Sequence, residues 1–226
     1  YLLFLLALAP VTASAQVAPA AAEAASYQGI HAAAHRGDVA QVRKLAASQA
    51  DLNRRDHHGR TALHVATFAR QHEVIRALAQ AGIDLQALEH DRYDAVTIAS
   101  VADDEATLRV LLQLGANAKQ VTSRYDGSAL IAAAHLGHDG VVRQLIAAGA
   151  PLDLVNNLGW TAVIESIVLG NGGETIKAIG QAARAEISAF LGRTVHLFLQ
   201  VKVRPNWLEE AERYSEMGLD FKDGNT

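Results

Sequence analysis

The sequence of 226 residues contains no cysteine, and aromatic side chains make up only 5% of it. The absence of cysteine excludes disulfides, a thiol nucleophile and cysteine-ligated zinc. Few aromatics together with abundant alanine favour closely packed short helices over a β-sandwich. The net charge of −4 comes from intermixed acidic and basic residues. This balance excludes a basic field over the whole chain that would attract nucleic acid in bulk.

A long apolar run is also missing, because the opening segment YLLFLLALAP is too short to span a bilayer comfortably. The small-x-small pattern read by signal peptidase follows at Ala13-Ser14-Ala15. We expect residues 1–15 to be a signal peptide without its start, since neither Met nor a basic segment precedes Tyr1. We expect residues 16–26 to be an Ala-rich tail or a loose helix. The mature chain would be periplasmic or secreted, with no stable membrane span. The alternatives are a buried or membrane-anchoring apolar helix and a cytoplasmic protein.

The sequence from residue 27 onward repeats itself with a period of about 33 residues. Small residues mark one register, with steps of 33, 33, 34 and 33: Ala33, Ala66, Ala99, Ala133 and Ser166. A second register carries Ala81-Gly82, Leu114-Gly115 and Ala148-Gly149. Each unit predicts a short helix, a turn, and a second helix with apolar positions three and four apart, as in Val74, Ile75 and Leu78. Neighbouring units must stack to bury these apolar faces.

These units resemble ankyrin repeats, most fully in the second repeat, where Asp56, Gly59, Thr61, Leu63 and His64 match the D-x-x-G-x-T-x-L-H pattern. The resemblance covers residues 27–170 and implies a helical solenoid of about four and a half repeats. It also implies that His64 hydrogen-bonds backbone between repeats. In the weak third repeat the carboxylates Asp103, Asp104 and Glu105 replace the Gly-His turn, and we expect a solvated loop there.

In ankyrin folds the β-turn fingers and first helices line a concave face that binds protein partners. Tyr, Trp and Arg dominate interface energetics. The candidate protein-binding residues on the fingers are Arg55, His57, His58, Arg60, Arg92, Tyr93, Arg124, Tyr125 and Trp160. The alternative is that they are ordinary solvated side chains on finger tips.

The repeat stops after Gly170, where a G-x-x-G segment, Gly170-Asn171-Gly172-Gly173, begins. An apolar stripe follows at helical spacing, formed by Ile176, Ile179, Ala183, Ile187 and Phe190. Alternating apolar residues from 195 to 203 then predict a strand. Residues 171–226 thus form a segment of another kind, with a helix and then one strand.

This segment resembles the C-terminal KH domain of bacterial Era-type GTPases, from about residue 167 to 223. The matching motifs are the G-x-x-G loop, the I-K-x-I-G-x-x-A-R helix, the L-x-V-K-V strand and the Trp207 tail. The resemblance implies an incomplete KH fold that contacts RNA backbone, of the 16S or small-subunit type, because glycines let phosphates approach backbone N–H groups. The implied RNA-binding residues are Gly170, Asn171, Gly172, Gly173, Lys177 and Arg184, with Asn171 replacing the more usual Lys.

Two explanations remain open for the junction between the ankyrin repeats and the KH segment. It is either a real fusion or a product of recombination or sequence assembly within residues 167–173, which fit both the ankyrin and the KH pattern. In a real fusion we expect helix 175–191 to dock where the second helix of a fifth repeat would lie, against Val141 to Ile146.

No motif of an enzyme is present. The phosphate-binding G-x-x-x-x-G-K-[ST] pattern, a nucleophile elbow and triad spacing are all missing, so neither nucleotide hydrolysis nor a cofactor is expected. Two local histidine pairs, His57-His58 and His135 with His138, lack a nearby carboxylate set of zinc type in the sequence, and no metal site is expected. The leading hypothesis is an exported, monomeric, protein-binding ankyrin scaffold. The alternative is cytoplasmic RNA binding through the KH loop.

Overall fold

The computed structural model describes residues 18–48, 51–168 and 174–197. The helices lie in a compact unit that ends at Val195, and the chain from His196 onward belongs to a second unit. Within the described ranges no helix has both the length and the apolar character that crossing a membrane requires.

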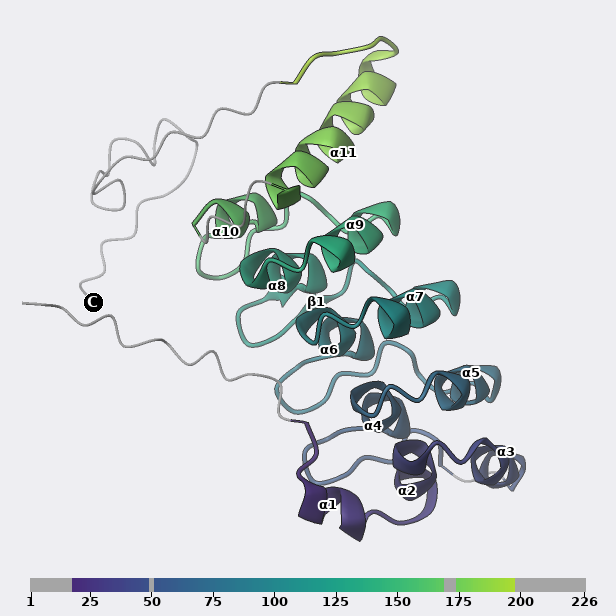
Figure 1. Cartoon of the computed structure of the whole chain (residues 1–226). Helices are drawn as coiled ribbons and strands as arrows, with labels where there is room; N and C mark the ends of the chain where they lie inside the picture. Colours follow the sequence, from purple (N-terminus) through teal and green to yellow (C-terminus); the bar gives the residue numbers. More distant parts are fainter. Residues whose placement is uncertain (1–17, 49–50, 169–173, 198–226) are drawn as a thin grey trace, which may run out of the picture. The chain divides into compact units, whose positions relative to one another are not determined.

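Ten of the described helices form five antiparallel pairs that stack along the first unit (Figure 1). The first helices of the pairs form an inner row: α2 (Gly29–Arg36), α4 (Ala62–Phe68), α6 (Ala95–Val101), α8 (Ala129–Leu136) and α10 (Ala162–Val168). The second helices form an outer row: α3 (Val39–Ala47), α5 (His72–Gln80), α7 (Glu105–Gln113), α9 (Asp139–Ala147) and α11 (Glu174–Leu191). Each helix contacts its partner and the next helix in its own row, which is the predicted ankyrin solenoid.

The small residues of the 33-residue register lie where the inner helices meet. Ala33, Ala66, Ala99 and Ala133 are fully or almost fully buried, and Ser166 is 2% exposed. A side chain of this size lets successive helices pack closely and bury the larger apolar residues of the outer row. The repeat period therefore places one small residue of each inner helix in the contact between neighbouring pairs.

A residue with left-handed backbone stands between the two helices of each described pair up to the fourth. Gly37 and Gly137 have φ of 75° and 74° there, whereas Arg70 and Asp103 occupy the same place with φ of 55° and 51°. The expectation of a solvated loop at 103–105 is wrong for Asp104, which is buried and whose Oδ1 accepts the Thr107 N–H at 3.0 Å. This carboxylate caps α7, so the unusual sequence still forms the regular turn.

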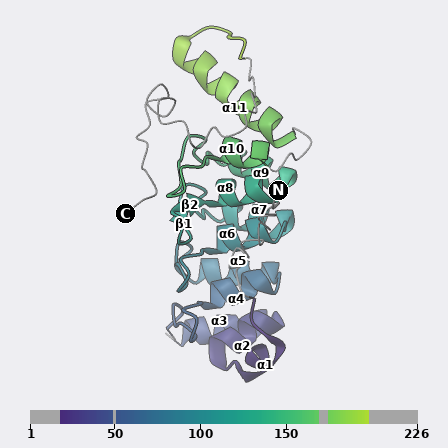
Figure 2. The ribbon, with the colours of Figure 1, turned by 90° about the vertical axis from the view of Figure 1, so that its left-hand side faces the viewer.

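The chain between pairs forms extended fingers (Figure 2). Each finger is numbered by the helix pair that it precedes, so the second finger leads into α4 and the fourth into α8. The fourth finger contains a short antiparallel hairpin, β1 (Val121–Thr122) with β2 (Gly127–Ser128), in which Val121 pairs with Ser128. Gly82, Gly115 and Gly149 end the outer helices with φ of 85°, 92° and 81°, as their position predicts. An additional helix, α1 (Ala21–Ser26), precedes the first pair and contacts α2.

Helix α11 completes the fifth pair with a sequence that is not an ankyrin helix. It contacts α9 and α10, and Ile179 joins the common apolar core at 3% exposure. The predicted docking against the fourth repeat is therefore confirmed. The apolar stripe is buried only toward its start, because Ile187 is 39% exposed and Phe190 is 90% exposed.

The chain turns back after α11 through Gly192, which has φ of 61°. The Val195 N–H donates to Ser188 Oγ at 3.2 Å. Residues 194–197 adopt no regular secondary structure, and the remainder of the predicted strand lies outside the described residues.

Candidate protein-binding face and KH segment

Three of the four described fingers share one backbone pattern, in which the first residue of the tip donates its N–H across the turn to a carbonyl four residues later. These bonds join Asp56 to Arg60 at 2.9 Å, Glu89 to Tyr93 at 3.0 Å and Asn156 to Trp160 at 3.0 Å. Successive fingers are also bonded to each other: the N–H groups of His90, Ser123 and Asn157 donate to the carbonyls of His58, Arg92 and Tyr125 at 3.0, 2.8 and 2.9 Å. The fingers consequently form a ladder and not a set of independent loops. We call this surface, residues 55–60, 88–93, 121–128 and 156–160, the finger face.

Acceptor side chains at the turn starts hold the tips in shape. Asp56 Oδ1 accepts the N–H groups of His58 and Arg60, both at 2.9 Å. Asn156 Oδ1 accepts the equivalent N–H groups of Leu158 and Trp160 at 3.0 and 2.9 Å. Because short Asx side chains bond readily to the backbone two residues on, these residues specify the turn locally.

His64 connects the second inner helix to the third finger. Its Nδ1 accepts the Thr61 N–H at 3.0 Å, which leaves the proton on Nε2, and Nε2 donates to the Tyr93 carbonyl at 3.2 Å. This tautomer follows from the hydrogen-bond network. Burial lowers the pKa of His64 to about 4, so the ring is neutral at physiological pH. His31 is the residue of the first repeat that corresponds to His64, and its Nε2 lies 3.0 Å from the Arg60 carbonyl of the second finger.

Most of the predicted binding residues lie at the surface of the finger face. The exposed ones are Arg55, His57, His58, Arg92 and Arg124, and the half-buried ones are Tyr93, Tyr125 and Trp160. The aromatic bodies therefore contribute to the fold and leave part of each ring accessible. The Arg124 guanidinium lies 5.9 Å from the Tyr125 ring centroid, within cation–π range.

Arg60 is a correction to the predicted set, because its side chain is only 2% exposed. Its Nε donates to Asp56 Oδ2 at 2.8 Å, and its Nη2 contacts Glu23 Oε1. Burial lowers the pKa of Arg60 from its ordinary value. Arginine side chains remain charged in proteins. Arg60 thus stabilises the finger from inside instead of presenting a charge to a partner.

A small pocket of about 120 Å³ opens between the second and third fingers. Its lining residues are His58, Arg60, Phe68, Glu89, Asp91, Tyr93 and Ile98. Sites for drug-sized ligands enclose roughly 300–1,000 Å³. This pocket can therefore receive one side chain of a partner, but it is too small for a larger organic ligand.

The predicted RNA-binding residues divide into two groups. Gly170, Asn171, Gly172 and Gly173 lie outside the described residues. Lys177 and Arg184 are exposed and seven positions apart on α11, which places both on one side of the helix. Lys177 Nζ lies 3.6 Å from Glu174 Oε1 in an exposed ion pair.

A carboxylate approaches both histidines of one pair, contrary to the interpretation of the sequence, and a single histidine of the other pair. Glu23 Oε1 lies 3.6 Å from His57 Nε2 and 3.7 Å from His58 Nε2. Glu165 Oε2 lies 2.8 Å from His135 Nδ1. Neither carboxylate is close to its histidines in the sequence, so only the fold reveals these neighbours.

Comparison with known families agrees with the two-part organisation of the chain. The family described as ankyrin repeats (3 copies) matches residues 19–89, and the single ankyrin repeat matches residues 126–157. The KH domain matches residues 165–208. The chain combines ankyrin repeats with a KH segment. The first match includes α1, which the sequence suggested to be a tail or loose helix.

The KH segment is similar to GTPase Era from several bacteria. It is 70% identical over 61 residues to GTPase Era of Dinoroseobacter shibae, which is 27% of this chain and 20% of that protein. It is 70% identical over 57 residues to the Brucella suis biovar 1 protein, covering 25% of this chain and 18% of the relative. The chain thus spans about a fifth of the length of these relatives, and the match covers only their KH part.

Proposed function

We propose that the chain is a non-enzymatic scaffold that binds a protein partner through its finger face. Ankyrin repeats bind proteins, and the matched ankyrin and KH families are non-catalytic. The observation that carries the proposal is the bonded ladder of fingers, which presents half-buried Tyr93, Tyr125 and Trp160 beside exposed arginines. Anchored aromatics lose little side-chain entropy on binding and suit interface hot spots.

The test is to identify a partner with the full chain and to measure its affinity for variants. Tyr93→Ala, Tyr125→Ala and Trp160→Ala are made singly, because each ring is half-buried and must be checked for folding by circular dichroism. Arg109→Ala, on the exposed side of outer helix α7, is the matched control. We expect at least one finger variant to weaken binding about 30-fold, the effect of losing a hot spot of roughly 2 kcal/mol. Binding that depends on Arg109 and on none of the three aromatics would contradict the proposal.

We further propose that residues 1–15 direct export to the periplasm. The support is the apolar opening run followed by the Ala13-Ser14-Ala15 cleavage pattern. N-terminal sequencing of the chain recovered from a periplasmic extract is expected to begin at Gln16. Recovery from the cytoplasm with Tyr1 still in place would contradict export.

RNA binding through the KH segment is the second candidate function, favoured by the identity of 70% with GTPase Era over this segment. Glycines of the loop at 170–173 would admit phosphates, and Lys177 and Arg184 would add charge on one side of α11. Small-subunit ribosomal RNA is the ligand class that the resemblance implies. Fluorescence anisotropy with single-stranded RNA tests this function, and Gly172→Asp is expected to abolish binding by adding a carboxylate to the loop. RNA binding by Gly172→Asp with the affinity of the unaltered chain would contradict binding through the loop at 170–173.

A further inference from the structure

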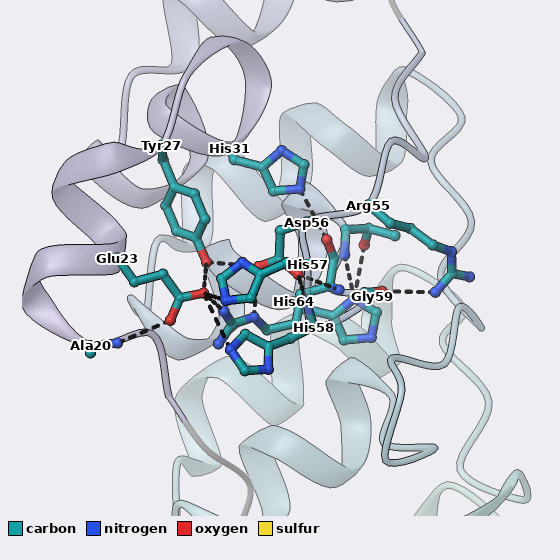
Figure 3. Close-up of polar contacts among 12 residues, drawn as sticks. Ala20, Glu23, Tyr27, His31, Arg55, Asp56, His57, His58, Gly59 and His64 are labelled. Carbon is teal, nitrogen blue, oxygen red and sulfur yellow. Dashed lines mark hydrogen bonds and ion pairs between the residues drawn. The ribbon is translucent and has the colours of Figure 1, made fainter.

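Three potential metal ligands from two distant segments meet beside the second finger (Figure 3). Glu23 lies in α1, whereas His57 and His58 lie at the finger tip. The Glu23 Oε1 atom is 3.6 Å from His57 Nε2 and 3.7 Å from His58 Nε2. All three ligand atoms lie within 4.8 Å of one another. Two imidazoles and one carboxylate are thus gathered at one point of the surface.

The backbone beneath the two histidines is fixed before any ligand binds. Asp56 Oδ1 accepts the His58 N–H at 2.9 Å, and the Gly59 N–H donates to the Asp56 carbonyl at 3.0 Å. The His90 N–H of the next finger donates to the His58 carbonyl at 3.0 Å. The two rings, which are consecutive in the turn, have centroids 4.1 Å apart and lie on the same side. A metal would therefore not have to order this loop, and preorganisation of that kind favours binding.

The carboxylate is held in place by other contacts that leave it able to bind a cation. Glu23 Oε2 accepts the Ala20 N–H at 3.3 Å, and Oε1 contacts the Arg60 guanidinium. The Tyr27 hydroxyl lies 3.4 Å from Oε1 and 2.9 Å from Asp56 Oδ2, and its single proton is donated over the shorter distance to Asp56. A carboxylate oxygen has two lone pairs, so Oε1 can accept from Arg60 and also coordinate an ion. Glu23 and Asp56 carry two negative charges against the one positive charge of Arg60, and this balance favours an added cation.

The two distances from the carboxylate to the imidazoles fit a small borderline cation. Tetrahedral zinc has bonds of about 2.0–2.2 Å to imidazole nitrogen and carboxylate oxygen, which places its ligand atoms roughly 3.3–3.5 Å from each other. The separations of 3.6 and 3.7 Å are within a few tenths of an ångström of that spacing. Imidazole ligands select Zn²⁺, Ni²⁺ or Cu²⁺ over Mg²⁺ and Ca²⁺. Three protein ligands leave a fourth position for water.

We propose that Glu23, His57 and His58 form a binding site for a divalent cation of the zinc class. The ion joins α1 to the second finger and so fixes the start of the ankyrin stack to its binding face. The site shares His57 and His58 with the finger face, but it does not need a protein partner to form, because it consists of these three side chains and the turn that carries two of them.

The test is calorimetric titration of the full, untagged chain with Zn²⁺ at pH 7.5. We expect one ion per chain, with no saturable site for Mg²⁺. His57→Gln and Glu23→Gln should each weaken binding at least tenfold. His57 is 67% exposed, so its replacement leaves the core unaltered. His90→Gln, an exposed histidine on the adjacent finger, is the matched control and should bind within twofold of the unaltered chain.

Hydrogen exchange of amides 21–26 gives a second measurement on the same samples. Zn²⁺ should slow this exchange in the unaltered chain and in His90→Gln, but not in Glu23→Gln. Non-saturable binding, unchanged affinity in His57→Gln, or unchanged affinity in Glu23→Gln would overturn the proposal. Binding without any change at 21–26 would also overturn it, because the carboxylate of α1 would then not be a ligand.

Discussion

Helices α5 and α11 occupy equivalent places in the outer row, yet they are held there by different contacts. Val74, Ile75 and Leu78 of α5 are at most 1% exposed, and α5 has outer-row neighbours on both sides, α3 and α7. In α11, which contacts α9 and α10, Ile179 is buried in the common core, whereas Phe190 is 90% exposed. The comparison shows that a helix of another family can close an ankyrin stack if its stripe matches the last repeat over about two turns.

The fingers differ from the outer helices in what they require of the sequence. A finger requires an acceptor at its turn start and bonds to the next finger, as Asp56 and His58 provide. An outer helix requires only apolar residues at suitable spacing. The outer row therefore tolerates a foreign sequence more readily than the finger face does.

The largest expected effect comes from truncating a side chain in the middle of the outer row. Leu111 of α7 is fully buried between neighbours on both sides. Leu111→Ala should lower the free energy of unfolding by about 3 kcal/mol, the cost of lost burial and a cavity. Ile179→Ala in α11 should cost about 2 kcal/mol or less, since α11 has an outer-row neighbour on one side only among the described helices. Urea unfolding measures the free energy of unfolding of both variants. Equal losses would contradict the difference between α11 and the interior helices of the outer row.

Acid should weaken the interior repeats through His64. The folded-state pKa of about 4 lies below the ordinary value of 6.5, so the unfolded chain binds a proton more tightly. The stabilising effect of a neutral His64 is complete above pH 6.5 and is lost progressively as pH falls toward 4. The loss should reach about 2 kcal/mol at pH 5 and about 3 kcal/mol at pH 4.

The control for this prediction is His64→Gln, which can still donate to the Tyr93 carbonyl but does not titrate. Its unfolding free energy should fall less steeply between pH 6.5 and pH 4 than that of the unaltered chain. Asp94 acts in the opposite direction in both proteins, because burial raises the pKa of its carboxyl and favours the folded state as pH falls. Parallel pH profiles for the two proteins would contradict a role for His64.

Substitutions in the turns between the two helices of a pair should change the free energy of unfolding by less than the core and pH effects above, and one of them should be stabilising. Asp103 is exposed and has left-handed backbone with φ of 51°, where two other repeats have glycine. Asp103→Gly should raise the free energy of unfolding by about 0.5–1 kcal/mol by relieving this strain. Gly137→Ala, at the equivalent turn with φ of 74°, should lower it by about 1 kcal/mol. Chemical denaturation compares them, and a loss of stability in Asp103→Gly would contradict the account of this turn.

The smallest effect is expected at the uncovered end of α11. Phe190→Ser removes an aromatic ring that is 90% exposed, so unfolding free energy should change by no more than about 0.5 kcal/mol. A loss above about 1 kcal/mol would show that this ring is covered in solution. The burial of the second half of α11 would then be closer to that of the first half than the structure indicates.

The repeat fold could be predicted because its signals are local and recur. Ala33, Ala66, Ala99 and Ala133 mark the inner helices by their spacing alone, and the stripe containing Ile179 predicts the docking of α11. Periodic small and apolar positions carry this information without any knowledge of distant contacts.

The parts that could not be predicted depend on contacts between distant segments. Arg60 resembles a surface arginine in the sequence, and only the approach of Glu23 from α1 together with Asp56 shows that it is buried. The same approach places a carboxylate beside His57 and His58, 34 and 35 positions later in the chain. No local pattern in the sequence encodes this meeting.

Hydrogen exchange along α11 tests most directly whether this helix closes the ankyrin stack. In the full chain the amides of residues 178–182, the part of α11 packed on α9, should exchange as slowly as those of α9 (Asp139–Ala147). Residues 187–191 should exchange faster, because their side chains are largely exposed. Ile179→Ala should speed exchange in 178–182 and leave α4 (Ala62–Phe68) unchanged. Exchange of 178–182 at the rate of an unstructured peptide, with α9 still protected, would contradict the account.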